Sequence, residues 1–148
     1  MGAGTGSVSV ELALAAPQGH VYAVECELDA CALIRRNREK FAAWNLSLIE
    51  GRAPAALEAL PAPDAVFIGG TKGSMAAVVD TVLAKNANAR ICIAAIALES
   101  LSAAIAALTA HGLSAEVTQL AVSRTRPAGR LHLLTANNPI FLITGERK

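Results

Sequence analysis

The chain is poor in charged and in aromatic side chains. Charged residues make up 17% of its 148 residues, aromatic residues make up 3%, and the formal net charge is +1. A charge so close to zero gives no electrostatic support for binding nucleic acid or a membrane surface. The longest apolar run, residues 91–98, is far shorter than the roughly 20 residues that cross a bilayer. Neither nucleic acid nor a membrane is expected as a partner.

Cysteine is also scarce. The 3 cysteines, Cys26, Cys31 and Cys92, form no C-x-x-C pair. An odd number without metal-ligand spacing predicts reduced, buried and inert thiols in a cytoplasmic protein, and it indicates no metal site. No repeat, low-complexity linker or block of charge divides the chain, so a single domain over residues 1–148 is expected.

Short apolar runs alternate with helical patterns along most of the chain. The expected strands are 20–25, 46–51, 64–70 and 89–96, and the expected helices are 7–16, 28–44, 54–60, 74–85 and 98–111, with Ser74 as a cap. A spacing of about 20 to 25 residues between strands is typical of βαβ units in a parallel sheet.

The end of the chain breaks this alternation. Residues 115–125 and 130–146 are both extended, and only the turn "RPAG" separates them. Two strands joined by a tight turn are antiparallel. The predicted fold is therefore α/β: a doubly wound, mainly parallel Rossmann-like sheet in three α/β/α layers, finished by a C-terminal antiparallel hairpin.

A glycine-rich loop opens the chain. Glycines at 2, 4 and 6 are followed by Ser7, where the dinucleotide fingerprint G-x-G-x-x-G has its third glycine. The next strand ends at Glu25, about 20 residues on, where a carboxylate can accept from both ribose hydroxyls of a nucleotide. A solvated strand end is the alternative interpretation of Glu25.

The stretch "EGRAPAAL" follows the next strand, at the same edge of the sheet. Ligands of open α/β sheets bind at this carboxyl edge. The backbone N–H of Ala53 is therefore a candidate donor to an adenine ring nitrogen. Taken alone, the stretch is only a turn before a helix that starts with proline.

Together, "GAGTGSVSVELA", "VYAVE", "EGRAPAAL" and "DAVFIGGTKG" resemble class I S-adenosylmethionine-dependent methyltransferases. With the late "NNP", they are most similar to the decarboxylating precorrin methyltransferases of cobalamin synthesis, over essentially the whole chain. The resemblance implies that Glu25 binds the ribose and Ala53 the adenine. It implies that the methionine and ribose end is held by Gly2, Ala3, Gly4, Thr5 and Gly6. Many relatives have aspartate where this chain has Arg52, so a side-chain contact to adenine is not expected there.

Methyl transfer is an in-line displacement in which the enzyme mainly holds a nucleophile near the methyl group. This agrees with a sequence that shows no catalytic triad, and no catalytic residue is assigned. The histidines at 20, 111 and 132 are expected to be structural or solvated. The bare glycines Gly69 and Gly70 would let a large flat ligand approach the backbone, although a simple loop is the alternative.

Precorrins carry many carboxylates, so basic side chains are candidate substrate ligands: Lys72, Arg124, Arg126 and Arg130. A solvated hairpin tip is the plainer interpretation of the three arginines. The resemblance implies methylation at C-15, with C-5 in some members, and loss of carbon dioxide from the C-12 acetate. It also suggests a homo-oligomer, possibly a tetramer. We hypothesise that the arginines orient the acetate.

Other functions stay open at this point. The alternatives are a class I methyltransferase for another small molecule, protein or RNA, and an inactive truncated copy. A nicotinamide-dependent oxidoreductase is disfavoured by Ser7 and the antiparallel end.

The strand that normally precedes such a loop, between "VYAVE" and "VFIGG", is not found. Its absence would leave two buried rows of backbone groups unpaired, at roughly 1–3 kcal/mol per lost bond. We expect a shortened form of a longer protein; alternatively, the neighbouring strands close the gap or another chain fills it.

Overall fold

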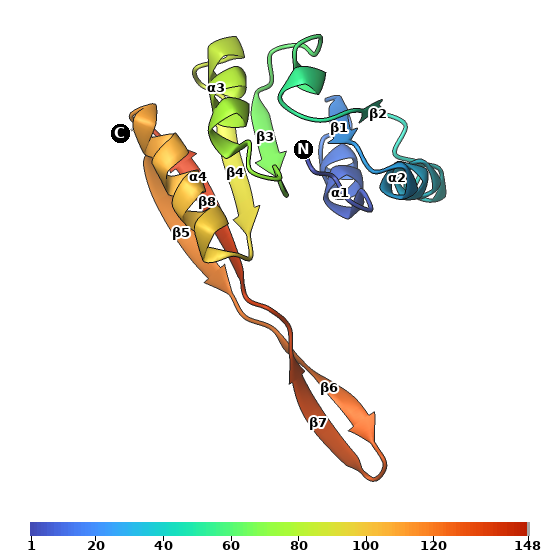
Figure 1. Ribbon diagram of the computed structural model, residues 1–148. Helices are drawn as coiled ribbons and strands as arrows, with labels where there is room; N and C mark the ends of the chain where they lie inside the picture. The colour runs from blue at the N-terminus through green and yellow to red at the C-terminus, as the bar shows by residue number, and fades with distance from the viewer. Residues whose placement is uncertain (148) are drawn as a thin grey trace.

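The computed structural model describes residues 1–147 (Figure 1). The helices are α1 (Ser7–Ala15), α2 (Leu28–Lys40), a 3₁₀ turn (Ala55–Leu57), α3 (Met75–Lys85) and α4 (Leu98–Ala110). The strands are β1 (Val21–Glu25), β2 (Leu46–Glu50), β3 (Ala65–Ile68), β4 (Arg90–Ala95), β5 (Ser114–Leu120), β6 (Ser123–Ala128), β7 (Leu131–Ala136) and β8 (Ile140–Glu146). None of the described helices is both long and apolar enough to cross a membrane.

The strands form three separate groups. β1 and β2 pair in parallel, and a four-stranded sheet has the order β3-β4-β8-β5. Within it β3 and β4 are parallel, whereas β8 runs antiparallel to both β4 and β5. The predicted Rossmann-like α/β fold with an antiparallel end is confirmed. β5 and β8 are joined by the β6–β7 hairpin and not by a helix, so they pair antiparallel.

The C-terminal hairpin differs in detail from the prediction. Each extended stretch is broken in two, and β6 and β7 form a ribbon that projects from the body (Figure 1). The prediction of a turn at "RPAG" is wrong for its first three residues, because Arg126, Pro127 and Ala128 still belong to β6. The chain reverses at Gly129, whose φ of 63° suits glycine.

Several helix ends and side-chain environments also differ. α2 ends at Lys40 and not at Trp44, because Ala42 takes a positive φ of 51° that no α-helix contains. The predicted helix 54–60 is reduced to its 3₁₀ turn. Ser74 precedes α3 but its hydroxyl donates to the Thr71 carbonyl at 2.7 Å, so it does not cap the helix through its side chain.

The thiols are reduced, but they are not all buried. Only Cys31 is buried, whereas Cys26 and Cys92 are partly exposed. Burial raises the pKa of the Cys31 and Cys92 thiols, because it disfavours the charged thiolate.

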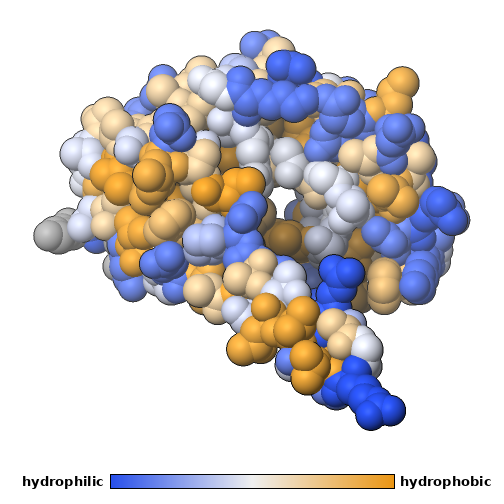
Figure 2. Space-filling view, turned by 60° about the horizontal axis from the view of Figure 1, so that its bottom comes forward, coloured by the Kyte–Doolittle hydropathy of each residue, from blue (hydrophilic) through white to orange (hydrophobic). Residues whose placement is uncertain are grey.

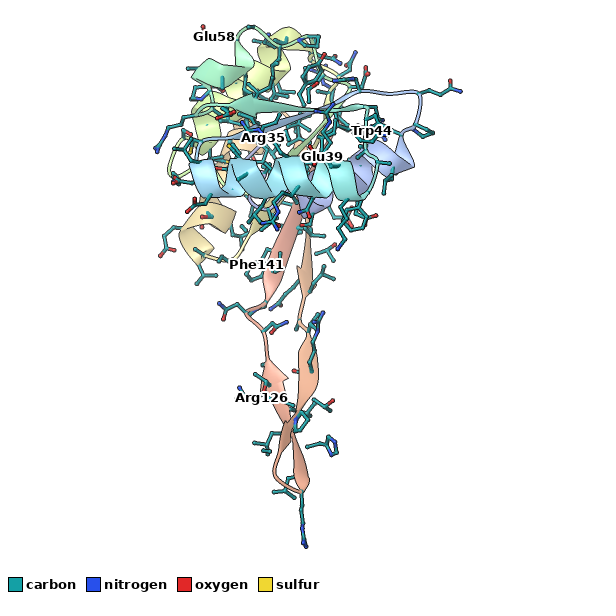
Figure 3. The ribbon with its side chains drawn as sticks, turned by 90° about the vertical axis from the view of Figure 1, so that its right-hand side faces the viewer. Arg35, Glu39, Trp44, Glu58, Arg126 and Phe141 are labelled. Carbon is teal, nitrogen blue, oxygen red and sulfur yellow. The ribbon has the colours of Figure 1, made fainter. Side chains whose placement is uncertain are left out.

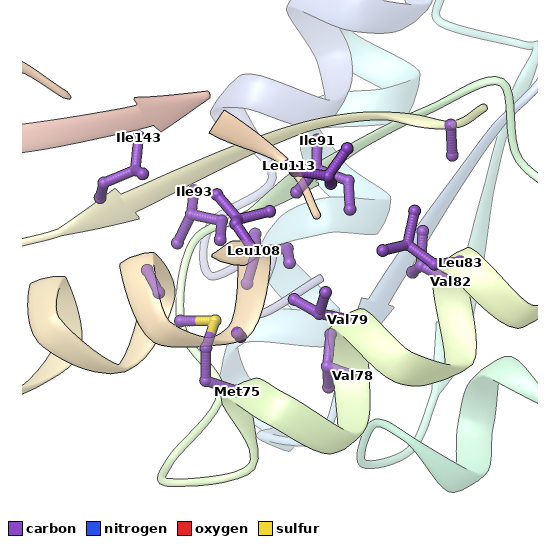
Figure 4. Close-up of a cluster of buried hydrophobic side chains, with 14 of the residues drawn as sticks. Met75, Val78, Val79, Val82, Leu83, Ile91, Ile93, Leu108, Leu113 and Ile143 are labelled. Carbon is purple, nitrogen blue, oxygen red and sulfur yellow. The ribbon is translucent and has the colours of Figure 1, made fainter. Parts of the chain in front are cut away.

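The larger hydrophobic core lies between the four-stranded sheet and helices α3 and α4 (Figure 4). Ile91, Ile93 and Ala95 are buried on one face of β4, because every second side chain of a strand points to the same face. Val79 of α3 and Leu108 of α4 meet this row. Both helices therefore pack on the sheet through one face each.

A smaller core lies between β1–β2 and helices α1 and α2. Its buried members are Val10, Ala13, Ala23, Ile34, Ala43 and Leu46. Ile34 of α2 is completely buried here, and Cys31, one turn earlier, is also buried, so α2 packs on the two-stranded sheet through this face.

Across residues 1–147, no strand lies between β1 and β3. The space-filling view shows an opening through the body between its two halves (Figure 2). The first residues of the chain cross this gap only at the carboxyl end of the strands, where Gly69 donates to the Met1 carbonyl at 2.9 Å. The sheet is thus split at the place that the sequence indicated.

Candidate active site

The glycine loop is shaped by close backbone approach. Gly2 has a φ of 58°, and a Cβ there would lie 2.4 Å from the Gly70 carbonyl oxygen. Gly6 has a φ of 79°, and a Cβ there would lie 2.8 Å from Cγ1 of Ile34 on α2. In the dinucleotide fingerprint, the third glycine allows close packing of the helix on its neighbours. Here Gly6 allows this close packing, so the next position can be Ser7, the first residue of α1.

Glu25 ends β1 beneath this loop and is 7% exposed. Its Oε2 accepts the Gly4 N–H at 2.8 Å, and its Oε1 accepts the N–H groups of Cys26 at 2.7 Å and Glu27 at 3.0 Å. A carboxylate has about four acceptor positions, so one on Oε2 stays available. The sequence predicted that the carboxylate accepts from both ribose hydroxyls. In this conformation it has room for one further hydrogen bond.

Two opposing effects act on the charge of Glu25. Burial disfavours the carboxylate, but the bonds from Glu27, Gly4 and Cys26 outweigh it and hold its pKa below the ordinary value. The side chain is therefore an anion that ties the loop to the strand end, and it contributes a negative charge where a ligand would meet the loop.

Ala53 lies in the loop after β2, half-buried. Its carbonyl oxygen lies 3.5 Å from the Ser74 Oγ, whose single proton is donated to the Thr71 carbonyl. Within the described residues its N–H has no acceptor, so it is free for the adenine contact that the sequence suggested.

An ion pair links the two halves at this edge. Lys72, in the loop after β3, bonds Glu27, which follows β1 by two residues. The bond to Glu27 raises the pKa of Lys72, and Lys72 lowers the pKa of Glu27. Sequence reasoning missed Glu27, although its position just past a strand end was a usable signal.

The structure brings together most of the predicted cofactor residues and separates the arginines from them. Arg124 and Arg126 belong to β6, and Arg130 lies in the turn after it. Figure 3 shows Arg126 on the projecting ribbon, away from the body that carries Arg35 and Glu39 on α2. The arginines therefore do not reach the glycine loop of their own chain.

The histidines lie elsewhere as well. His20 bonds the Ser47 hydroxyl at 2.8 Å, and His111 bonds Asp80 at 2.7 Å. His132 is exposed on β7. In the part of the chain that the structure describes, no three His, Cys, Asp or Glu side chains gather as metal ligands.

A family model described as a precorrin methyltransferase domain matches residues 1–147. This chain belongs to the precorrin methyltransferase family. A probable cobalt-precorrin-6B C(15)-methyltransferase (decarboxylating) of Pyrobaculum calidifontis is 42% identical over 146 residues, 97% of this chain and 75% of that protein. The cobalt-precorrin-6B C(15)-methyltransferase (decarboxylating) of Salmonella typhimurium is 35% identical, covering 100% of this chain and 77% of that protein.

Solved structures agree with the sequence relatives. The precorrin-6Y C5,15-methyltransferase of Geobacter metallireducens has a TM-score of 0.92 and 35% identity, over 100% of this chain and 77% of that one. A precorrin-8w decarboxylase of Methanobacterium thermoautotrophicum has a TM-score of 0.89 and 30% identity, over 99% and 78%. The family resemblance inferred from the sequence is confirmed.

Proposed function

We propose that this chain methylates a precorrin at C-15 and removes carbon dioxide from the C-12 acetate, as a step of cobalamin biosynthesis. The observation that carries the proposal is the similarity to decarboxylating C(15)-methyltransferases over 97–100% of the chain. Residues 1–148 act as one domain in this proposal, because Val24 of β1 is part of the larger core.

S-Adenosylmethionine is the proposed cofactor, and the site fits it. The free acceptor position on Glu25 suits a ribose hydroxyl, and the Ala53 N–H suits an adenine nitrogen. A Cβ at Gly4 would meet nothing within 4 Å, so the outer side of the loop is open to a ligand. When bound, the cofactor supplies an electrophilic methyl group on sulfur.

In the proposed reaction, the residues of this chain bind and orient the cofactor and the substrate. Gly2, Ala3, Gly4, Thr5 and Gly6 present backbone to the methionine and ribose end. Gly69 and Gly70, which touch this loop through backbone, border the space for the flat substrate. Lys72 is the candidate cation for a substrate carboxylate, and its bond to Glu27 would have to be exchanged for that contact.

A direct assay tests the function. Incubation with cobalt-precorrin-6B, and separately with a cobalt-free precorrin, should yield a product that has gained one methyl group and lost one carbon dioxide. Glu25→Gln should weaken S-adenosylmethionine binding about 10- to 100-fold, the effect of losing a charged acceptor. Glu50→Gln is the matched control, because Glu50 ends the neighbouring strand and pairs with Arg35. Tight binding of NAD with no product would refute the proposal.

We further propose a homo-oligomer in which the β6–β7 ribbon of one chain serves a neighbouring copy. Leu131, Leu133 and Leu134 are 65%, 53% and 74% exposed on this ribbon, which is unusual for leucine unless a partner covers it. The arginines of the ribbon would then reach the substrate of the neighbour.

A mixing experiment tests this arrangement. Arg126→Ala and Glu25→Gln chains, each impaired alone, should regain activity when mixed, because one hybrid site has both native residues. Unchanged decarboxylation in Arg126→Ala would contradict the role of the arginine. Sedimentation of a Leu133→Glu variant as the same oligomer as the native chain would contradict the interface. The cytoplasmic location stays a prediction.

A further inference from the structure

We propose that Arg52 and Lys72 together bind one peripheral carboxylate of the substrate. The inference rests on the proposed function for the class of ligand, a tetrapyrrole that carries many carboxylates. For the site, it rests on the contact between the two loops that carry the cations, on the backbone conformation of Lys72 and on the charges around both side chains.

The two cations lie on loops that meet. Arg52 follows β2 and Lys72 follows β3, so both loops leave the sheets at the carboxyl edge. The carbonyl oxygen of Ala53, the residue after Arg52, lies 3.5 Å from the Ser74 Oγ. The same hydroxyl donates to the carbonyl of Thr71, the residue before Lys72. Ser74 therefore connects the chain segments that present the two positive charges.

The backbone at Lys72 is strained. Its φ of 48° lies in the left-handed region, which a residue with a side chain seldom adopts, and Gly73 follows with a φ of 95°. Such conformations persist where the surrounding structure holds them, and they cluster at ligand sites. In this conformation the Lys72 ammonium group pairs with Glu27, two residues beyond β1. The lysine is thus held at the carboxyl edge, and 56% of its side chain stays exposed there.

The charges at this edge do not balance. Glu27 and Lys72 neutralise each other, whereas the exposed guanidinium group of Arg52 has no ion pair or hydrogen bond within residues 1–147. The bond to Glu27 raises the pKa of Lys72, and the charge of Arg52 opposes this rise, so the two cations repel each other. An anion that meets both side chains would remove this repulsion.

Both cations are required for a net gain in binding. A substrate carboxylate that displaces Glu27 from Lys72 replaces one carboxylate by another, so this exchange alone contributes little. Arg52 makes the exchange favourable, because its guanidinium group gains an acceptor that it lacks in the free chain, in the bidentate geometry that suits it.

The position of Arg52 indicates which carboxylate it binds. Arg52 adjoins Ala53, the proposed donor to adenine, whereas Gly69 and Gly70 border the proposed space for the flat substrate. Because adenine and the reactive methyl group lie at opposite ends of the cofactor, a carboxylate at Arg52 is remote from the reacting carbon. The pair therefore orients the substrate through its periphery, and the C-12 acetate is not its ligand.

Binding of uroporphyrin, an octacarboxylic tetrapyrrole, tests the site without methyl transfer. In a fluorescence titration, Arg52→Gln should raise the Kd about 10-fold and Lys72→Gln about 5-fold, because each loses a charge-assisted bond. The double variant should stay near about 10-fold, well below the product of the two effects, because both side chains bind one carboxylate. Arg90→Gln is the matched control: this exposed arginine begins β4 at the opposite edge, and its loss should change the Kd less than about 2-fold.

Glu27→Gln gives a readout that a merely structural role would not move. It should lower the Kd about 3-fold, because Lys72 no longer has to be released from its partner. The same change in a Lys72→Gln chain should have no effect on the Kd.

Two results overturn the proposal. One is an equal Kd for Arg52→Gln and Arg90→Gln. The other is a native chain that binds uroporphyrin no more tightly than its octamethyl ester, which has the same rings without the charges. Failure of the proposed function is a separate result: no product from cobalt-precorrin-6B, together with binding of uroporphyrin that depends on Arg52, would refute the reaction and retain the carboxylate site.

Discussion

The two halves of the body differ in the number of their strands and in the size of their hydrophobic cores. Among the described residues, the half around β3-β4-β8-β5 has four strands and most of a core of 17 buried residues, one of which is Val24 of β1, whereas the half around β1–β2 has two strands and a separate core of 6. Hydrophobic stabilisation grows with the apolar area buried, so the second half depends more on its contacts with the first. The Gly2–Gly6 loop, which we propose binds the cofactor, belongs to this second half.

Several contacts join the halves, and three of them involve residues beside the proposed cofactor site. Val24 enters the larger core, Gly2 lies against Gly70, and Glu27 pairs with Lys72. All three lie near the carboxyl edge, where the proposed cofactor residues are.

The strongest test of this difference removes one buried side chain from each half. Ile93→Ala should lower the free energy of unfolding by about 4 kcal/mol, and Ile34→Ala by about 3 kcal/mol, through lost burial and a cavity. Both isoleucines are 0% exposed. Hydrogen exchange should accelerate throughout the body in Ile93→Ala, but only in α1, α2, β1 and β2 in Ile34→Ala. The same set of accelerated amides in both variants would show that the halves unfold as one unit.

The next effect concerns the backbone contact between the halves. Gly2→Ala should cost about 3 kcal/mol, because the added Cβ meets the Gly70 backbone and φ is positive. Gly4→Ala is the control: its φ is also positive at 55°, but nothing lies within 4 Å of the added Cβ. It should cost only about 1 kcal/mol in urea unfolding. Equal costs would mean that the Gly70 loop gives way.

The buried amine at the junction should make stability depend on pH. The pKa of the Met1 ammonium group is lowered from 8.0 to about 6 by burial, so the unfolded chain binds more protons between these values. Stability should therefore rise by about 2 kcal/mol from pH 6 to pH 8, and the penalty is fully present below pH 6.

A chain acetylated at Met1 is the control for this measurement. It cannot gain the charge, so its stability should change less over the same range, and the difference between the two curves isolates the amine from the histidines. Parallel curves for the two chains would contradict the assignment.

The smallest effect on stability is expected at the ion pair. Lys72 and Glu27 are 56% and 60% exposed, and exposed pairs contribute little. Lys72→Gln and Glu27→Gln should both leave the unfolding midpoint in urea unchanged. Lys72→Gln alone should raise KM for the precorrin, since it removes the cation and not its partner. An equal rise in KM for both variants would assign the effect to the pair and not to Lys72.

Much of this site could be predicted from local patterns. One helix and one strand separate the Gly2–Gly6 loop from Glu25. Their combined length is nearly fixed, so the spacing between the loop and the carboxylate can be recognised in the sequence. The bond from Gly4 to Glu25 could not be predicted, because it depends on the angle at which α1 leaves the loop. The Glu27–Lys72 pair joins residues 45 positions apart, and no local pattern encodes that approach.

The sequence by itself determined the alternation of strands and helices, the antiparallel end and the family, because periodicity, turn residues and motif spacing act over short stretches. Only the tertiary structure decided that β6 and β7 leave the body, that Gly6 packs on Ile34 and that the Met1 ammonium group bonds the Phe67 carbonyl of β3. These features depend on which surfaces meet across the fold. Packing between residues distant in the chain sets them.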